Sequence, residues 1–403
     1  MLIPNCLPDH GKPLDPADAD ALGERAVDDV ERFLRLRDER GPTPLHALPA
    51  LAGALGVGAV FVKDEGFRLG LGSFKALGGA YAVVRLTLEE AARRLGRAVE
   101  IEDWRSDPVR AVAKGMTFGC ATDGNHGRSV AQGAALVGAR AVIFVHSGVT
   151  DERVAAIARF GAEVIRVEGT YDNSVVESAR VCAENGWTIV SDTSWPGYER
   201  IPLMVMQGYA ATVREALREL PEPPTHVFMQ AGVGGLAAAV AGHLALVLED
   251  ARPAFVVVEP SRSACLAAST RVGHAIKVEP GERTVMAMLE CYEPSPVAWR
   301  VLSRVADAFM TVEDEDAVAV MNRLARPLRG DPAIVSGESG GAGLAGLIRA
   351  ATSAAARAAL GLGARSRVLL VNSEGATDPG RYRELVSVDR PTTAPRKAVE
   401  VVA

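Results

Sequence analysis

Residues Gly70 to Gly79, with the sequence Gly-Leu-Gly-Ser-Phe-Lys-Ala-Leu-Gly-Gly, place Lys75 among glycines and apolar side chains where a loop turns into a helix. Ser73 is a suitable N-cap for that helix. The positive end of the helix dipole and the apolar neighbours both disfavour an ammonium at Lys75. Since a Schiff base requires a neutral amine, Lys75 is a candidate for covalent catalysis. The alternative is a solvated surface lysine, because most lysines are exposed.

Short runs rich in Val, Ile and Phe alternate with helical segments along the chain. Most of these runs lack the alternation of a half-exposed strand, which is typical of parallel strands buried on both faces, with helices on each side. The pattern predicts an open α/β fold with two sheets. We expect strands at 59–65, 116–122, 140–145, 162–167, 187–192, 226–231, 254–260, 333–339 and 368–373. Ligands of such folds bind at the carboxyl ends of strands, so Asp123, Asp192, Gly232 and Ser373 are candidate site residues.

The composition is that of a soluble globular protein. The chain has 403 residues, of which 48% are hydrophobic and 23% charged, and its formal net charge is -6. This length predicts two or three domains, and the mild acidity gives no reason to expect nucleic acid or an anionic membrane as a partner. No signal peptide is recognisable, and His243 interrupts the longest apolar run, 236–248. We therefore expect a cytoplasmic protein.

Five cysteines are dispersed without a C-x-x-C pair, and no metal-binding motif occurs. This spacing predicts neither a zinc site nor a disulfide scaffold, and reduced thiols in the cytosol are the expected state. Cys265 and Cys291 flank one segment, so a bridge between them stays a hypothesis.

A glycine-rich turn follows the expected strand at 226–231. The residues Gly232-Val233-Gly234-Gly235-Leu236 precede a long Ala-rich helical segment. Successive backbone N–H groups at such a turn form an anion pocket, which favours a phosphate ligand. The spacing also fits a dinucleotide fingerprint, with Glu259 about where a ribose-binding acid lies. A nicotinamide-dependent oxidoreductase is therefore an alternative on this feature.

Two further segments carry polar groups at strand ends. In Thr122-Asp123-Gly124-Asn125-His126-Gly127 the small residues let backbone donors approach a carboxylate or a ring, and Asn125 is able to hydrogen-bond a phenolic oxygen. Asp123 is a candidate for moving protons. In the second segment, Asp192 precedes Trp195 and Tyr198, which suits recognition of a substrate ammonium. Helix capping is the alternative for both carboxylates.

The lysine in Ser73-Phe74-Lys75, the loop 124–127, the turn 232–235 and a late Ser373 occur in the order found in fold-type II pyridoxal-phosphate enzymes. The sequence resembles this family, which includes serine and threonine dehydratases and cysteine synthase, over about residues 40–380. The resemblance implies two open, mostly parallel sheets, in a large and a small domain with the active site between them. It implies a large domain of residues 1–81 and 196–403, a smaller mobile domain of 82–195, and a homodimer. Residues 387–403 are expected to form a loose tail.

The resemblance also implies residue roles. Lys75 carries the cofactor, pyridoxal 5′-phosphate, and the turn Gly232-Val233-Gly234-Gly235-Leu236 holds its phosphate. Asn125 faces the 3′ oxygen of the ring, and Ser373 faces the pyridine nitrogen. A neutral hydroxyl at that nitrogen is typical of β-elimination and replacement.

One departure narrows the substrate. Dehydratases usually carry a serine where this chain has Asp123. With the segment 192–202, this residue resembles the family branch that eliminates ammonia from 2,3-diaminopropionate. That branch implies that Lys75 takes the α-proton of the L-substrate, that Asp123 takes that of the D-substrate, and that Asp192 positions the β-amino group. Thr122 and His126 are the further expected substrate-binding residues. A serine or threonine dehydratase of the same fold is the nearest alternative.

Overall fold

The structure is a computed structural model that describes residues 1–37, 41–122, 124–386 and 400–402. The chain divides into two compact units. Unit 1 comprises Met1–Glu24, Pro42–Arg68 and Thr212–Ala403, and unit 2 comprises Arg25–Gly41 and Leu69–Ala211. The domain boundaries expected from the sequence stay a prediction. The expected loose tail falls mostly on residues 387–399 and 403, which lie outside the described residues.

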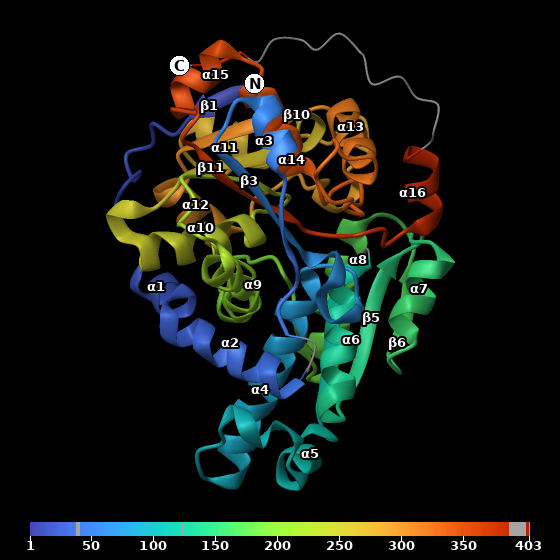
Figure 1. The fold of residues 1–403 in the computed structure, drawn as a ribbon. Coiled ribbons are helices and arrows are strands. Elements are labelled where there is room, and N and C mark those ends of the chain that lie inside the picture. The colour runs from blue at the N-terminus through green and yellow to red at the C-terminus, as the bar shows by residue number, and fades with distance from the viewer. Residues whose placement is uncertain (38–40, 123, 387–399, 403) are drawn as a thin grey trace. The chain divides into compact units, whose positions relative to one another are not determined.

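Unit 1 contains a seven-stranded sheet with the strand order β1-β10-β9-β8-β11-β3-β2 (Figure 1). Its five central strands run parallel, whereas β1 and β2 pair antiparallel at the edges. The central strands read as apolar runs because both faces of a parallel sheet are buried. The bounds are β1 Leu2–Pro4, β2 Leu45–Ala47, β3 Ala59–Asp64, β8 His226–Gln230, β9 Ala254–Pro260, β10 Ala308–Val312 and β11 Arg367–Asn372.

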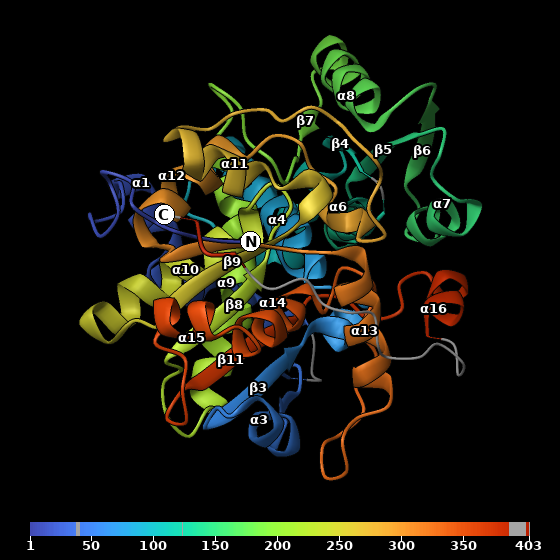
Figure 2. The same ribbon diagram turned by 90° about the horizontal axis from the view of Figure 1, so that it is seen from above.

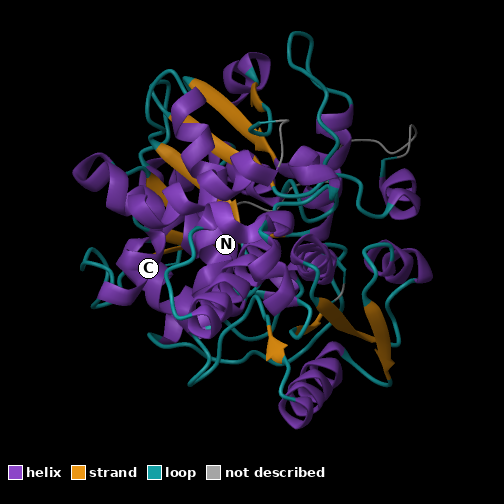
Figure 3. Ribbon diagram, turned by 90° about the horizontal axis from the view of Figure 1, so that it is seen from below, coloured by secondary structure: helices purple, strands orange, loops and turns teal. Residues whose placement is uncertain are grey.

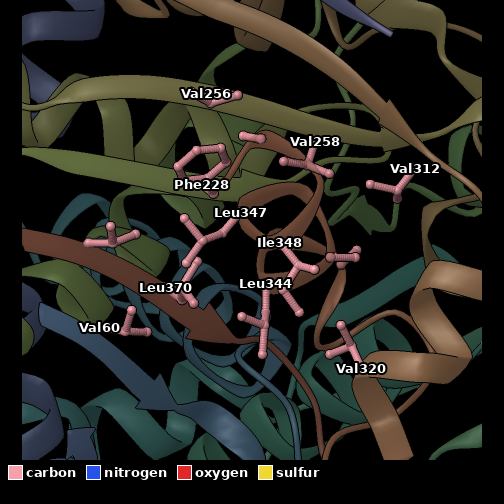
Figure 4. Packing of buried hydrophobic residues seen from close by; sticks show 14 of the residues in the cluster. Val60, Phe228, Val256, Val258, Val312, Val320, Leu344, Leu347, Ile348 and Leu370 are labelled. Atoms are coloured by element: carbon pink, nitrogen blue, oxygen red, sulfur yellow. The ribbon is translucent and has the colours of Figure 1, made fainter. Parts of the chain in front are cut away.

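Helices pack against this sheet. Leu344, Leu347 and Ile348 of α14 lie against Phe228 of β8 and Leu370 of β11 in the buried core, which Figure 4 shows. Figure 2 shows α14 and α15 beside β11. The helices of unit 1 are α1 Pro16–Leu22, α3 Pro49–Leu55, α10 Gly235–Leu248, α11 Cys265–Val272, α12 Pro296–Val305, α13 Asp314–Ala325, α14 Ala342–Ala351, α15 Ala354–Leu360 and α16 Pro379–Leu385, together with the short 3-10 turns η1 Glu65–Gly70, η3 Glu249–Ala251, η4 Ser261–Ser263 and η5 Ala287–Leu289.

Unit 2 contains a four-stranded parallel sheet with the order β6-β5-β4-β7. Figure 3 separates helices and strands by colour and shows helices flanking the strands. The strands are β4 Thr117–Ala121, β5 Arg140–His146, β6 Glu163–Val167 and β7 Thr188–Ile189. The helices are α2 Glu24–Arg37, α4 Lys75–Leu95, α5 Asp107–Ala113, α6 Asn125–Val137, α7 Asp151–Ala158, α8 Tyr171–Asn185 and α9 Arg200–Glu219, with η2 at Ile101–Arg105; α9 continues into unit 1.

The two sheets confirm the expected α/β class, and eight of the nine expected strands occur, seven with at most small shifts at their ends and the one expected at 187–192 as the two residues of β7. The strand expected at 333–339 is wrong. Backbone groups there bond to loops, since Ile334 N–H donates to Leu324 O and Gly337 N–H donates to Glu374 O. Strand β10 was missed, although its five residues are all buried. No helix among the described residues is long and apolar enough to cross a membrane.

Two glycines allow α4 and α9 to approach closely within unit 2. A Cβ on Gly78 would lie 2.6 Å from Val205 O and 2.5 Å from a ring carbon of Tyr209. Gly208, on the other helix, would place a Cβ 2.8 Å from the Cα of Gly78. The helix that begins at Lys75 is therefore held in place by backbone contact.

Gly78→Ala should destabilise the protein by about 1–3 kcal/mol, because overpacking of this size forces the helices apart. Gly53→Ala is the matched control, since nothing lies within 4 Å of a Cβ on Gly53 and this helical residue is exposed. Alanine there should leave stability unchanged or raise it. Urea unfolding followed by circular dichroism measures both variants, and equal midpoints would contradict the close packing.

Candidate active site

Lys75 is the first residue of α4, as the sequence predicts. By the bounds of α4 the N-cap position is Phe74, but its backbone is already helical (φ -53°, ψ -27°), so Ser73 is the residue that precedes the helical backbone. Ser73 still serves the helix start, since its Oγ accepts a hydrogen bond of 3.3 Å from the N–H of Lys75. The Phe74 ring lies 5.5 Å from Lys75 Nζ, close enough for a cation–π contact.

The amine of Lys75 contacts Oδ2 of Asp192 in an ion pair. The Asp192 side chain is 13% exposed. Burial by itself raises the pKa of Asp192, but the charge of Lys75, with His126, lowers it below its ordinary value. The ion pair favours an ammonium at Lys75, which corrects the expectation that its surroundings favour only the neutral amine. A route for the lysine proton is therefore part of any chemistry at Lys75.

The loop before α6 is organised by Thr122. Its Oγ1 accepts hydrogen bonds from the N–H groups of Gly124 (3.0 Å) and Gly127 (3.1 Å). Gly124 has φ of 150°, a conformation that only glycine adopts readily. Asn125 and His126 then occupy the first turn of α6, and both are buried. Asp123 lies outside the described residues.

The aromatic residues after Asp192 hold its loop in shape. Trp195 and Tyr198 stack with ring centroids 4.1 Å apart. The Tyr198 hydroxyl donates to Ile189 O at 2.8 Å and accepts from Ser191 N–H at 3.0 Å. These bonds tie the end of β7 to the turn that carries Asp192. The Tyr198 hydroxyl therefore positions this loop, and recognition of a substrate ammonium by the two rings stays a prediction.

In unit 1, the glycine-rich turn joins β8 to α10 as the sequence predicts. Gly234 has φ of 100° and forms the N-cap of α10. A Cβ on Gly232 would lie 2.9 Å from Cys291 Sγ, so this position also requires glycine. The first N–H groups of a helix have no partner within it, and the helix dipole adds positive potential. Val233, Gly235 and Leu236 complete this anion-binding turn at the start of α10.

Ser373 follows β11, the strand next to β8, so it lies at the same edge of the sheet as the turn. It is 3% exposed, and its N–H donates to Gly340 O at 3.2 Å. Two buried amides fix this edge. Gln230 Nε2 donates to Gly340 O at 2.7 Å, and Asn372 Nδ2 donates to Asp64 Oδ1 at 2.7 Å. The sequence analysis did not single out these amides, although each directly ends a strand.

The contacts of Glu259 decide between the two ligands considered for the turn 232–236, a phosphate group and a nicotinamide dinucleotide. Glu259 is fully buried, and its oxygens accept from Leu266 N–H (2.8 Å) and Ala267 N–H (2.7 Å) at the start of α11. Burial raises the pKa of Glu259 to about 8. Since both oxygens cap a helix, Glu259 does not supply the ribose-binding acid of a nicotinamide site. The turn itself, with Cβ-intolerant Gly232, fits a phosphate.

Polar groups in unit 2 fit a cofactor that reacts with the lysine. His126 Nδ1 and the Tyr209 hydroxyl are buried without a hydrogen-bond partner among the described residues. Tyr209 packs edge-on against Phe74, with ring centroids 4.8 Å apart. The sequence analysis missed Tyr209, since a tyrosine within a helical pattern carries no distinct signal. No cluster of three metal-ligating side chains occurs in the ranges that the structure describes, and no disulfide joins Cys265 to Cys291 there.

The model of the pyridoxal-phosphate dependent enzymes matches residues 36–374. The chain belongs to this family. Its cofactor is therefore pyridoxal phosphate, which agrees with a lysine at the start of α4 and a glycine-rich turn at the start of α10.

The chain is 40% identical over 362 residues to diaminopropionate ammonia-lyase of Escherichia coli K12, covering 88% of this chain and 89% of the relative. It is 35% identical over 356 residues to diaminopropionate ammonia-lyase of Salmonella typhimurium LT2, covering 85% and 87%. A crystal structure of the Escherichia coli enzyme with an aminoacrylate–PLP azomethine reaction intermediate matches with a TM-score of 0.85 and 35% identity, covering 96% of both chains. This likeness confirms the fold-type II architecture.

Proposed function

We propose that this family member is a carbon–nitrogen lyase that converts 2,3-diaminopropionate, as the D-isomer, the L-isomer or both, to pyruvate and two ammonia. The observation that carries the proposal is the contact of Asp192 with Lys75, which places a carboxylate beside the reactive amine. A substrate with a second, cationic amino group pairs with such a carboxylate, whereas the neutral hydroxyl of serine does not. The similarity to two diaminopropionate ammonia-lyases supports the same substrate.

Bound pyridoxal phosphate takes up the negative charge that develops at the substrate α-carbon. The side chains of the protein bind and orient the substrate and move its protons. Lys75 is the covalent attachment point and removes the α-proton of the L-substrate. The turn 232–236 would hold the cofactor phosphate through the backbone N–H groups at the start of α10. Asn125 and Ser373 donate hydrogen bonds to the polar ring atoms.

Asp192 binds the β-ammonium of the substrate through a charge-assisted hydrogen bond. Because this amine is already protonated, it leaves without the strong acid that hydroxide departure requires. Thr122 and His126 are the further substrate-binding residues of unit 2. Thr122 holds the loop before α6 in shape, because its Oγ1 accepts hydrogen bonds from two backbone N–H groups.

The product ratio tests this function. Two ammonia per pyruvate are expected from 2,3-diaminopropionate, against one from serine or threonine, with a higher kcat/KM for the diamino acid. A higher kcat/KM for serine or threonine would replace the proposal with a dehydratase of the same fold. Coupled assays with glutamate dehydrogenase and lactate dehydrogenase measure both products.

Asp123→Asn should reduce kcat/KM for the D-isomer by about 10²–10⁴, the usual contribution of a general base, and reduce that for the L-isomer far less. The reason is that the α-hydrogens of the two isomers lie on opposite faces of the bound substrate. Separate progress curves for the pure isomers measure the difference. Equal losses with both isomers would refute the division of roles between Asp123 and Lys75.

We also propose a cytoplasmic homodimer that binds neither nucleic acid nor membranes. The net charge of -6 and the lack of a membrane-spanning helix among the described residues support the second part. The dimer rests on the family resemblance. Size-exclusion chromatography with light scattering tests it, and a single-chain mass of 42.3 kDa would contradict it.

A further inference from the structure

His126 lies beside the reactive pair within unit 2. Its Nε2 is 2.8 Å from Val190 O, and its side chain is 4% exposed. A carbonyl oxygen only accepts, so Nε2 carries the proton of the neutral ring and Nδ1 presents a lone pair. Nδ1 lies 3.9 Å from Oδ2 of Asp192, the same oxygen that contacts Lys75. Nδ1 has no hydrogen-bond partner in the described part of the chain.

We propose that His126 is a positioning residue that accepts, at Nδ1, the proton that Lys75 gives up, with Asp192 as the bridging carboxylate. It acts on the lysine through Asp192, and the proposal rests on the function proposed above, in which Lys75 must become a neutral amine. An N–H bond of Lys75 breaks, its electron pair stays on Nζ, and an N–H bond forms at Nδ1. The ion pair of Asp192 with Lys75 is thereby replaced by one with the His126 imidazolium, and the net charge is unchanged.

The basicity of the His126 imidazole depends on the charge of Lys75. Burial lowers the pKa of His126 most, and the charge of Lys75 lowers it further, whereas Asp192 and the Val190 carbonyl raise it. Loss of the lysine charge therefore raises the proton affinity of the imidazole. Asp192 stays ionised after the transfer because the charge of His126, like that of Lys75, lowers its pKa.

Three other titratable groups of the described residues that interact with Asp192 are uncharged at neutral pH. Burial raises the pKa of the Cys120 thiol on β4, of the Tyr198 hydroxyl after β7 and of the Tyr209 hydroxyl on α9. Among the described residues, the charges that shift the pKa of the imidazole are those of Lys75, on α4, and Asp192.

The first test is an NMR titration of the full chain labelled with ¹⁵N-histidine and freed of cofactor. The chain has seven histidines, and His126→Gln assigns the signal by its loss. In the wild type, the neutral ring should carry its proton on Nε2. In Lys75→Met, His126 should gain its second proton, on Nδ1, at higher pH than in the wild type. A proton on Nδ1 of the neutral ring, or an unchanged or lower titration midpoint in Lys75→Met, would overturn the proposal.

The second test is the rate at which added pyridoxal phosphate becomes attached to Lys75, followed by absorbance between pH 6 and 9. Glutamine keeps a donor for Val190 O and an acceptor in place of Nδ1, but it takes up no proton. His126→Gln should attach the cofactor about 10²-fold more slowly at pH 7, the lower end of the range of general-base effects, and approach the wild-type rate at pH 9. His274→Gln, at an exposed site in unit 1, should behave as the wild type throughout.

A loss that is equal at every pH would indicate a purely structural role and overturn the proposal, as would no loss at all. If no cofactor attaches to the wild type at any pH, the proposed function fails, whereas the NMR titration still decides whether His126 responds to the charge of Lys75. The two failures are thereby distinguished.

Discussion

Lys75→Ala should abolish elimination, with a loss of at least about 10³-fold in kcat, because one residue serves both as covalent attachment point and as base. The visible absorbance of the bound cofactor should disappear with it. The expected effect is specific to this lysine, since Lys75 begins α4 and its amine contacts Asp192. Steady-state kinetics with 2,3-diaminopropionate and an absorbance spectrum of the purified variant measure the two effects together.

Lys114→Ala is the matched control, because Lys114 is an exposed lysine of the same unit. It should keep the spectrum and the activity. Circular dichroism of Lys75→Ala should show an intact fold, so that loss of activity is not loss of structure. A coloured and active Lys75→Ala protein would be incompatible with the proposed role.

Asp192→Asn should reduce kcat/KM for 2,3-diaminopropionate by about 30–5000-fold, which corresponds to the 2–5 kcal/mol typical of truncating a buried charge pair. The amide keeps the size of the side chain but loses the charge that the β-ammonium needs. Serine carries no second cation, so its slow turnover should fall much less. The preference for the diamino acid over serine should therefore decrease, which competition between the two substrates measures.

The control for this variant is Asp107→Asn, which removes an exposed carboxylate from the same unit. It should leave both substrates unaffected. An equal loss for serine and 2,3-diaminopropionate in Asp192→Asn would show that Asp192 acts only on Lys75 and has no role in substrate selection.

Much of the fold follows from patterns within single segments. Buried parallel strands have apolar runs of five to seven residues, and β9 begins and ends where the sequence predicts. The run 333–339 begins with three apolar residues, but its backbone bonds to Glu374 and to the end of α13. Such bonds depend on distant residues, so no local pattern reveals them.

The candidate site also combines features that follow from a local sequence pattern with features that depend on distant residues. The glycine turn and Lys75 were predictable, because a helix start and a run of glycines have direct physical meanings. The ion pair of Lys75 with Asp192 was not, since the two residues are 117 positions apart. That pair also reversed the expected preference of the lysine for its neutral form. The hydrogen bonds of the Tyr198 hydroxyl to Ile189 and Ser191 were likewise not predictable, because no residue pattern marks them.

The attachment of the cofactor to one particular amine is the central claim. Borohydride reduction of the protein with bound pyridoxal phosphate, followed by proteolysis and mass spectrometry, identifies that amine most directly. The reduced cofactor should be found on the peptide that contains Lys75, and not on the buried Lys63, whose amine is held by Glu219 and Thr43 O. A label on any other lysine, or a protein that takes up no label, would contradict the account.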